Sequence, residues 1–274
     1  GMDAVALTDH GNLHGAVDFY REAKDAGIKP ILGIEAYVAP DLNGTASDRT
    51  NREHTGVADG GFHLVLLAEN ETGWRNLLKL SSDAYLQGFY YKPRMDKTTL
   101  TEWGDGLIAI NGHLGSSLAF YMRQYVNGDK SAWDRAVAEA RWHAETFGTN
   151  ADGEPRFFIE LQHHEADQNA INPHLIRLAR ELELPLVCDN DSHFLGRDDH
   201  EAHDALICVS MQKTVDDQSR LKYSTELYVK SPQEMRELFT AYEDAGEEAL
   251  ANTRRVADRC NVDLDFTANH PPVL

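Results

Sequence analysis

The chain has 274 residues, of which 42% are hydrophobic and 26% are charged, and its formal net charge is −19. This length can bury a core for one barrel-sized domain or two smaller ones, and the composition is typical of a soluble globular protein. The acidic balance excludes a broad electrostatic contact with nucleic acid, which requires clustered Lys and Arg. It is compatible with a cation site or, more simply, with a solvated acidic surface.

The sequence shows neither a membrane span nor a signal peptide. No apolar run approaches the roughly 20 residues that a span needs, and the start of the chain lacks the pattern of a secretory signal. The three cysteines, Cys188, Cys208 and Cys260, lack the CxxC spacing of zinc fingers and redox motifs. We therefore predict a cytoplasmic protein without disulfides and without a membrane partner.

Short apolar runs alternate with amphipathic segments along the first two thirds of the chain. The predicted strands are residues 4–7, 30–38, 62–68, 107–110, 157–161 and 185–188. The predicted helices are 12–27, capped by Asn12, and then 72–87, 116–126, 131–147 and 172–183. This alternation predicts an α/β fold, either a (β/α) barrel or an open doubly wound sheet. The lack of a Gly-rich phosphate fingerprint weakens the dinucleotide-binding option.

Three segments depart from this alternation. Residues 41–61 are polar and Gly-rich, which indicates a functional flap or a disordered insertion. Residues 89–96 are aromatic and basic without a clear period. After Phe194 we expect helices at 198–209 and 245–260, a short strand within 221–230, and a helix opened by the capping box Ser231-Pro232-Gln233-Glu234.

The stretch from Leu186 to Phe194 organises the candidate site. An apolar run there ends in Asp189-Asn190-Asp191-Ser192-His193, as a buried parallel strand does when it enters a site. If the chain stays extended past Asn190, Asp191 and His193 point to the same side and could hold one cation.

Other predicted strands also end in or beside imidazoles, and the carboxyl ends of barrel strands gather at one face. The residues at such ends are His10, His113, His164, Asp191 and His193. Glu35 lies within its strand and His63 at the start of one, so both fit this rule less well.

Imidazole and carboxylate ligands together suit zinc, manganese or iron. Such ions turn water into a nucleophile near neutral pH, and two of them can clamp a phosphoryl displacement. For any single histidine, hydrogen bonding in a turn is the simpler interpretation, and only the set of strand ends favours a metal site. Asn190 and either Lys92 or Arg94 are candidate phosphate or orientation groups, with ordinary loop hydrogen bonding as the alternative.

Five motifs carry a resemblance to a known family. They are Ala6-Leu7-Thr8-Asp9-His10-Gly11-Asn12, Gly33-Ile34-Glu35-Ala36-Tyr37, His63-Leu64-Val65-Leu66-Leu67-Ala68, Gly88-Phe89-Tyr90-Tyr91-Lys92-Pro93-Arg94 and Asn190-Asp191-Ser192-His193-Phe194. In order and spacing they closely resemble the polymerase and histidinol phosphatase (PHP) domain. The version they resemble is the one at the amino end of bacterial replicative DNA polymerase III alpha subunits.

The resemblance implies a fold and a ligand set. The fold would be a distorted, TIM-like (β/α)7 barrel with a trinuclear site for zinc, manganese or iron. The implied ligands are His10, Glu35, His63, His113, Asp191 and His193, with Glu35, Asp191 and His193 as catalytic residues. His113 stands where many relatives have a Cys. Asp9, Asn190 and His164 would lie near the site, and Lys92 or Arg94 would hold phosphate.

The resemblance also implies a domain division, with the PHP barrel at 1–195 and a region connecting to a polymerase core at 196–274. The family begins with a strand that carries a His-x-His pair and then an Asp, and we expect these ligands to precede Gly1. The sequence is therefore interpreted as a fragment, in which a three-metal site would be incomplete.

The implied parent protein extends DNA with deoxynucleoside triphosphates and magnesium, using carboxylates beyond Leu274. Its implied partners are DNA, a sliding clamp, a clamp loader and an exonuclease subunit. The chemistry of this segment would be metal-dependent phosphodiester hydrolysis, as in a proofreading 3′–5′ exonuclease. Two alternatives remain open: a non-catalytic scaffold that docks a separate exonuclease, and a free-standing PHP phosphoesterase acting on a small phosphate.

Overall fold

The computed structural model of the chain describes residues 2–42 and 45–267. It divides into two compact units. The amino-terminal unit contains Asp3–Ala109, Thr149–Arg156 and the described residues after Arg255, and the central unit contains Ile110–Gly148 and Phe157–Arg255. Residues 43 and 44 of the predicted loop lie outside the described residues, as do the outer ends of both predicted domains.

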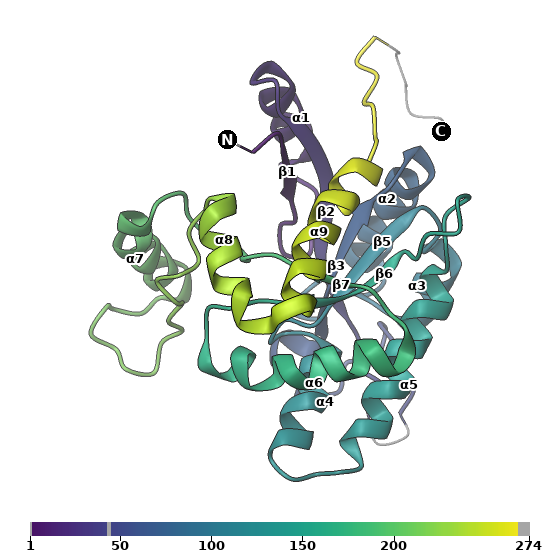
Figure 1. The fold of residues 1–274 in the computed structure, drawn as a ribbon, viewed down its shortest axis with the longest axis vertical. Coiled ribbons are helices and arrows are strands. Elements are labelled where there is room, and N and C mark those ends of the chain that lie inside the picture. Colours follow the sequence, from purple (N-terminus) through teal and green to yellow (C-terminus); the bar gives the residue numbers. More distant parts are fainter. Residues whose placement is uncertain (1, 43–44, 268–274) are drawn as a thin grey trace. The chain divides into compact units, whose positions relative to one another are not determined.

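The amino-terminal unit alternates strands with helices, as the hydrophobic pattern predicts (Figure 1). Its elements are β1 (Ala4–Leu7), α1 (Ala16–Asp25), β2 (Lys29–Val38), the 3₁₀ turn η1 (Ala58–Gly60), β3 (Phe62–Ala68), α2 (Glu71–Leu86), β4 (Arg94–Met95), α3 (Lys97–Trp103) and the first residues of β5 (Leu107–Asn111). The predicted strands and the helix at 72–87 are therefore confirmed to within one residue.

Strand β2 is the centre of this unit. It pairs in parallel with β1 and β4, but antiparallel with β3. The antiparallel pairing departs from an all-parallel barrel, and it places the start of β3 against the end of β2, with His63 opposite Tyr37. A residue at the start of β3 therefore reaches the same edge as the carboxyl end of β2.

The start of α1 corrects one prediction. The helix begins at Ala16, with Gly15 at the N-cap position, so Asn12 does not cap it. Instead the Asn12 amide donates to the carbonyl of His10 (3.1 Å), and its Oδ1 accepts from the backbone N–H of His14 (3.0 Å). Because Asn binds local backbone groups as readily as it caps helices, its side chain here closes the turn after His10.

The aromatic and basic segment at 89–96 leads into two elements that sequence periodicity missed. β4 has two residues, which is too short to show a period. α3 follows a capping box in which Asp96 accepts from the Thr99 backbone (2.8 Å) and the Thr99 hydroxyl bonds the Asp96 backbone. This capping box was a usable signal for the helix.

The central unit contains most of the helices. Its elements are the end of β5, α4 (Ser117–Val126), α5 (Ala132–Phe147), β6 (Phe157–Leu161), α6 (Ala166–Leu182), β7 (Leu186–Cys188), the 3₁₀ turn η2 (Arg197–Asp199), α7 (His200–Met211), α8 (Pro232–Phe239), the 3₁₀ turn η3 (Thr240–Tyr242) and α9 (Glu243–Arg259), of which the last turn belongs to the other unit. β6 and β7 pair in parallel, and α4 and α5 pack side by side (Figure 1).

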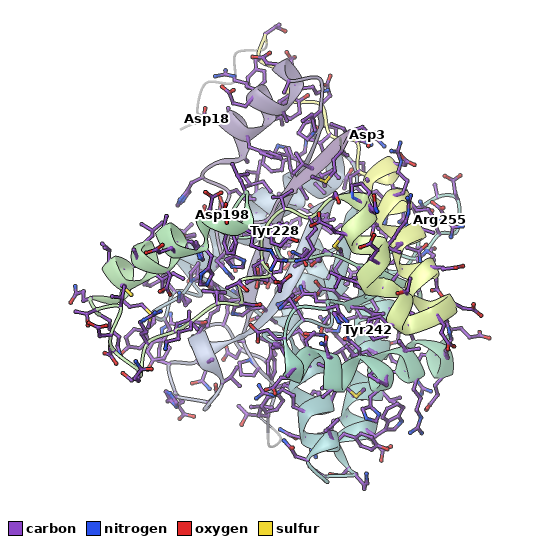
Figure 2. All side chains as sticks on the ribbon, turned by 60° about the vertical axis from the view of Figure 1, so that its left-hand side comes forward. Asp3, Asp18, Asp198, Tyr228, Tyr242 and Arg255 are labelled. Carbon is purple, nitrogen blue, oxygen red and sulfur yellow. The ribbon has the colours of Figure 1, made fainter. Side chains whose placement is uncertain are left out.

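Helix α6 begins six residues before the predicted start at 172 and carries Pro173 inside it. The first turn holds Gln168, whose amide bonds the carbonyl of Gly112 and the side chain of Asn172. Asn172 in turn donates to the hydroxyl of Tyr242 (2.6 Å), which is labelled in Figure 2. These buried polar contacts favour the longer helix, and they offset the helical hydrogen bond that Pro173, in the interior of α6, cannot donate.

The predicted strand within 221–230 is wrong for the described residues. This segment makes one isolated bridge, between Phe194 and Tyr228, and stays irregular otherwise. The predicted capping box is confirmed, because the Ser231 hydroxyl accepts from the Glu234 backbone and Glu234 reaches back to Ser231. Within the described part of the chain, no helix combines the length and apolarity of a membrane span.

Candidate metal centre

Three of the predicted ligands meet in the amino-terminal unit. His10, Glu35 and His63 each offer one ligand atom, and these atoms lie within 4.8 Å of one another. Nδ1 of His63 is 2.6 Å from Oε1 of Glu35, and Nδ1 of His10 is 3.6 Å from the same oxygen. Among the described residues, this is the group of His, Cys, Asp and Glu that meets the spacing for a metal ion.

The backbone explains why two residues that fit the strand-end rule poorly still join the cluster. β2 is ten residues long, and Glu35 and Tyr37 lie two apart on one face of it. The antiparallel register places His63 opposite Tyr37, so its ring reaches Glu35 diagonally across the two strands. His10 joins through a backbone bridge to Glu35, beyond the end of β1.

Tyr37 and Gly11 shape the floor of the cluster. The Tyr37 ring lies 5.0 Å from the His63 ring, edge to face, and 6.1 Å from the His10 ring. Gly11 has φ of +69°, and a Cβ at this position would lie 2.8 Å from the Tyr37 ring. Only glycine therefore allows the chain after His10 to pass this close to the ring.

The cluster combines one buried carboxylate with a more exposed imidazole. Glu35 is 7% exposed, whereas the His10 side chain is 42% exposed. Burial, and then the nearby carboxylates of Asp59 and Glu35, raise the pKa of Tyr37, so its hydroxyl stays protonated. The arrangement gives the site one side toward solvent and one fixed anion inside.

Asp59 extends this site. Its Oδ2 is 3.6 Å from Nε2 of His63, and its Oδ1 is 3.6 Å from Nζ of Lys92. A hydrogen bond with His63, and the charge of Lys92, lower the pKa of Asp59 despite its partial burial. Asp59 is not among the predicted site residues, and its only signal in the sequence is a carboxylate four residues before His63.

The donor set fits a transition metal. Two imidazole nitrogens and one carboxylate oxygen are the ligands that zinc, manganese and iron share, whereas magnesium and calcium prefer oxygen alone. Of the three side chains, Glu35 is buried and His10 is exposed, so the cluster is open to solvent on one side. The chemistry of these residues therefore agrees with the predicted class of cofactor.

His113 lies in the central unit, against Glu160 of β6. Both the ring Nδ1 (2.9 Å) and the backbone N–H (3.2 Å) of His113 approach Oε2 of Glu160, which is fully buried. The Gln162 amide bridges Glu160 (2.7 Å) and Asp189 (3.0 Å). This closed network was not foreseen, although the carboxylate inside the apolar run 157–161 is the same signal that marked Glu35.

The pKa values of the two carboxyl groups in this network shift in opposite directions. Burial raises the pKa of Glu160, but His113 and the hydrogen bonds from Asp189 and Gln162 outweigh burial and lower it to about 2. Burial and the adjacent Glu160 carboxylate raise the pKa of Asp189 well above its usual value. Glu160 is therefore ionised near neutral pH, whereas Asp189 keeps its proton to a higher pH than an ordinary aspartate.

Asp191 and His193 approach each other in an unexpected way. The chain does not stay extended past Asn190, because Asp191 has φ of +46°, so the stated premise is wrong. The turn still places Nδ1 of His193 2.7 Å from the carbonyl and 3.7 Å from Oδ1 of Asp191. The pair converges through a left-handed residue and not through strand alternation.

Asn190 and His164 are held by neighbouring backbone and amide groups. The buried Asn190 amide donates to the carbonyls of Glu226 and Tyr228 (2.8 and 2.9 Å), which ties the strand end to residues 226–230. Nε2 of His164 bonds Oε1 of Gln162 (2.6 Å), and burial lowers the pKa of His164 to about 4. The contacts of the Asn190 amide are therefore ordinary loop hydrogen bonds.

The two candidate phosphate residues differ sharply. Arg94 is 1% exposed, and its guanidinium donates to the carbonyls of Arg49 (3.0 Å) and Asn51 (2.5 Å). It therefore organises the loop 45–60 and is not proposed as a phosphate ligand. Lys92 is half-buried beside Asp59, close to the cluster. The Asp9 side chain is exposed, and its carbonyl accepts from the Glu35 backbone N–H (3.1 Å).

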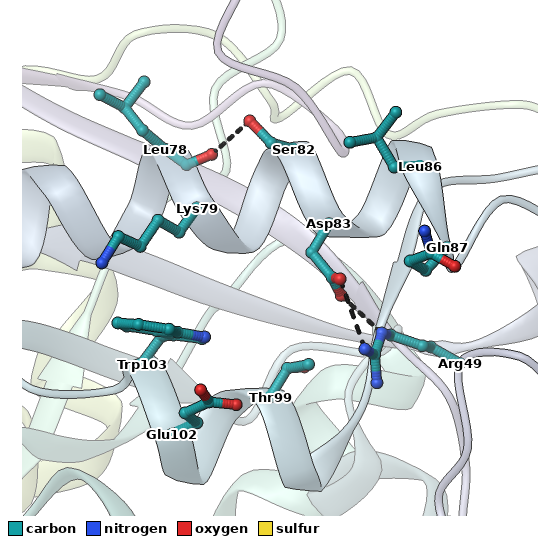
Figure 3. Close-up of a pocket in the computed structure, with 10 residues that line it drawn as sticks. All are labelled: Arg49, Leu78, Lys79, Ser82, Asp83, Leu86, Gln87, Thr99, Glu102 and Trp103. Atoms are coloured by element: carbon teal, nitrogen blue, oxygen red, sulfur yellow. Dashed lines mark hydrogen bonds and ion pairs between the residues drawn. The ribbon is translucent and has the colours of Figure 1, made fainter. Parts of the chain in front are cut away.

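A surface cavity of about 420 Å³ lies between α2 and α3. Figure 3 shows Lys79 above the Trp103 ring and Arg49 paired with Asp83 at its two ends. Its cations are thus already engaged, and none of the predicted site residues lines it. The cavity is not a candidate for the predicted chemistry.

The comparisons with known proteins identify the family of the chain. The PHP domain family matches residues 1–164, and the chain belongs to this family. Among similar curated proteins are the DNA polymerase III subunit alpha of Borreliella burgdorferi (41% identity, 100% of this chain, 22% of that protein), of Thermus aquaticus (42%, 95%, 20%) and of Treponema pallidum (42%, 96%, 21%). The chain thus spans about a fifth of the length of these relatives.

Family membership confirms the predicted fold class, an α/β fold of the distorted TIM-like type found in PHP domains. The predicted division at residues 195 and 196 stays a prediction.

Proposed function

We propose that this chain is the PHP domain of a DNA polymerase III alpha subunit and that it hydrolyses phosphodiester bonds with the help of bound metal ions. The observation that carries the proposal is the convergence of His10, Glu35 and His63. The 3′ end of a DNA strand is the proposed substrate, so the reaction is that of a 3′–5′ proofreading exonuclease.

Each residue of the centre has a distinct task. His10, Glu35 and His63 would hold a zinc, manganese or iron ion, and such an ion supplies a nucleophile from water at neutral pH. The Glu35 carboxylate fixes the His63 ring through the 2.6 Å contact, which orients the imidazole before a ligand arrives. The buried Tyr37 ring would keep water from the inner side of the cluster, and Lys92, which contacts this ring, would contact a phosphate oxygen.

The ligand predictions in the central unit remain part of the proposal. Asp191 and His193 converge to 3.7 Å, which supports their assignment as ligands and catalytic residues. His113 is held by Glu160, as second partners hold the imidazoles of metal sites. These three residues stay predicted ligands.

The polymerase assignment rests on the relatives that carry that name and on their 33–42% identity to this chain. In the whole protein, DNA, deoxynucleoside triphosphates and magnesium would serve synthesis outside this segment. A sliding clamp, a clamp loader and an exonuclease subunit are proposed partners, and the cytoplasm is the proposed compartment.

The test uses the full-length protein and two readouts. Elemental analysis after dialysis measures the bound metal, and a 3′-labelled single strand reports exonuclease activity. We expect Glu35→Gln to lose metal and activity together. Glu22→Gln, which removes the same charge from an exposed position on α1, should keep both. Metal that stays bound in Glu35→Gln at the native level would contradict the assignment of the centre.

A non-catalytic scaffold is the second candidate function. It is favoured by the closed network around Glu160, in which a predicted ligand, His113, makes structural contacts. The two candidates differ in one outcome of the same experiment. A native protein that holds metal but releases no 3′ nucleotide would support the scaffold and exclude the exonuclease.

A further inference from the structure

Three aromatic side chains stand in solvent near the candidate metal centre. Tyr85, on the last turn of α2, is 40% exposed, Phe89 is 50% exposed and Tyr91 is 82% exposed. Rings this exposed contribute little to the core, and clustered exposed apolar groups mark binding surfaces. We call Tyr85, Phe89 and Tyr91 the aromatic rim.

The backbone holds the rim in a defined shape. The rings of Tyr85 and Phe89 are nearly parallel, with centroids 6.1 Å apart and an angle of 25° between their planes. Tyr91 has φ of +59°, a left-handed conformation that costs a bulky residue free energy. A bridge between Tyr90 and Lys92 closes this turn. A strained turn thus places an aromatic ring in water, which suggests a role outside folding.

Lys92 connects the rim to the metal centre from one side. It follows Tyr91 in the chain, and its Nζ lies 5.2 Å from the centre of the Tyr37 ring. The Tyr37 ring in turn contacts the rings of His10 and His63. Lys92, whose Nζ is also 3.6 Å from Oδ1 of Asp59, thus follows an exposed aromatic residue in the chain and contacts the ring that packs on the ligand cluster.

His14 provides a second connection between the aromatic rim and the metal centre. Its ring lies 6.0 Å from the Tyr85 ring, and its backbone N–H bonds the side chain of Asn12. Asn12 also bonds the carbonyl of His10, so one short turn runs from the predicted ligand to the rim. The rim is therefore local to the centre, within the same compact unit.

We propose that the rim stacks on unpaired bases at the 3′ end of a DNA strand, while Lys92 contacts the phosphate next to His10, Glu35 and His63. This inference rests on the proposed function and names how that site would hold its substrate. Only unpaired bases expose their faces to a ring, so the occupant is a single-stranded or frayed end.

The charge of the chain favours this mode of binding. A net charge of −19 gives no broad attraction for phosphates, so affinity must come from contacts that do not depend on net charge. Base stacking is such a contact, and it tolerates any sequence, as a proofreading site requires. Exposed rings also suit a protein partner, but the lysine that follows Tyr91 and contacts the Tyr37 ring favours a polyanion.

Photocrosslinking locates the strand even if other parts of the full-length protein bind DNA. An oligonucleotide with 5-iododeoxyuridine at its last two positions is irradiated on the protein in excess chelator, and the adducts are mapped by mass spectrometry. We expect adducts on Tyr85, Phe89 or Tyr91. Phe89→Ala with Tyr91→Ala should lower the yield of the adduct on the unaltered Tyr85 about tenfold, because one stacked base contributes that much or more to affinity.

The controls separate stacking from loss of folding. Tyr91→Phe keeps the ring and should restore the yield, whereas Phe266→Ala removes an exposed ring that packs on Arg21 and should leave it unchanged. Adducts confined to other regions, or an equal yield in the double alanine variant, would overturn the proposal. A protein partner at the rim would give that same negative result.

The experiment also separates this inference from the proposed function, because crosslinking needs no metal and no hydrolysis. Rim-dependent adducts in a protein that never releases a nucleotide would refute the exonuclease but keep the rim as a DNA contact. Hydrolysis with adducts independent of the rim would refute the rim alone.

Discussion

Glu35 and Glu160 lie in similar local sequence contexts, but their surroundings in the fold differ. Each lies in an apolar strand, is buried, and contacts a histidine, His63 at 2.6 Å and His113 at 2.9 Å. Glu35 shares its cluster with the exposed His10, whereas Glu160 is sealed among Gln162, Asp189 and His113. One carboxylate faces a site that a ligand can enter, and the other closes a hydrogen-bond network.

This difference shows that a buried carboxylate in a strand is an ambiguous signal. A buried charge requires hydrogen-bonding or charged partners. Both carboxylates have such partners, but the residues that provide them differ between the two sites. At Glu35 the partners are imidazoles, which can exchange a proton for a metal ion. At Glu160 they also include the Gln162 amide, which donates a hydrogen bond, and the Asp189 carboxyl, whose pKa is raised.

The largest expected effect is a loss of stability when Glu160, in the closed hydrogen-bond network, is replaced. Glu160→Leu should lower the free energy of unfolding by about 3–5 kcal/mol, because Asp189 and Gln162 lose the acceptor of their hydrogen bonds inside the core. Urea unfolding measures the loss. Glu160→Gln keeps an acceptor oxygen and should cost less. An equal loss in both variants would show that the charge, and not the acceptor, decides.

At the open site the same kind of change should affect the metal ion. Glu35→Gln is expected to weaken zinc or manganese binding about 100-fold or more, since even outer partners of metal ligands contribute tenfold or more. Calorimetric titration gives the affinity. Glu160→Gln, made in parallel, should leave the affinity for the first ion nearly unchanged. A comparable loss of affinity in both variants would break the distinction between the two carboxylates.

The third prediction concerns the pH dependence of stability that His164 causes. His164 has a pKa of about 4 in the fold, below its usual 6.5, because it is buried. The unfolded chain therefore binds more protons between these values, so stability is complete above pH 6.5 and falls as the pH drops toward 4. Partial solvent access limits the loss to about 2 kcal/mol. In His164→Gln the midpoint of unfolding should change less with pH across this range. A pH dependence equal to that of the native protein would show that His164 does not cause it.

The smallest effect is expected at the edge of the open site. Asp59→Asn removes the carboxylate that faces Nε2 of His63 and should lower metal affinity about tenfold. The same titration that serves Glu35→Gln measures this change. Asp152→Asn, at an exposed position in the same compact unit, is the matched control. If both variants bind metal equally well, Asp59 does not support the centre.

Local sequence patterns predicted the elements well where a period or cap was visible. The apolar runs that became β1, β2, β3, β6 and β7 were recognised within a residue or two, and the capping box at Ser231 formed as expected. The failures have local causes. Asn12 closed a turn in place of capping a helix, and β4 is too short to display a period.

The candidate residues themselves came from the sequence, since imidazoles and carboxylates beside apolar runs can be read without a fold. His10 was named in this way, whereas Glu35 and His63 fit the strand-end rule less well and joined the predicted ligand set through the family resemblance. The same reading also named Arg94, which the fold buries against backbone carbonyls, and overlooked Asp59 and Glu160. Residue type indicates a capacity for chemistry, and the neighbours decide whether it is used.

What the sequence alone determined is therefore the alternation of strands and helices, the caps and the choice of chemistry-bearing side chains, because these depend on neighbours along the chain. Only the tertiary structure decided which of those side chains meet. The antiparallel register of β2 and β3 brings His63 to Glu35, and a left-handed Asp191 brings its carboxylate to His193. Both contacts arise from pairing and turn geometry, which hydrophobic periodicity does not encode.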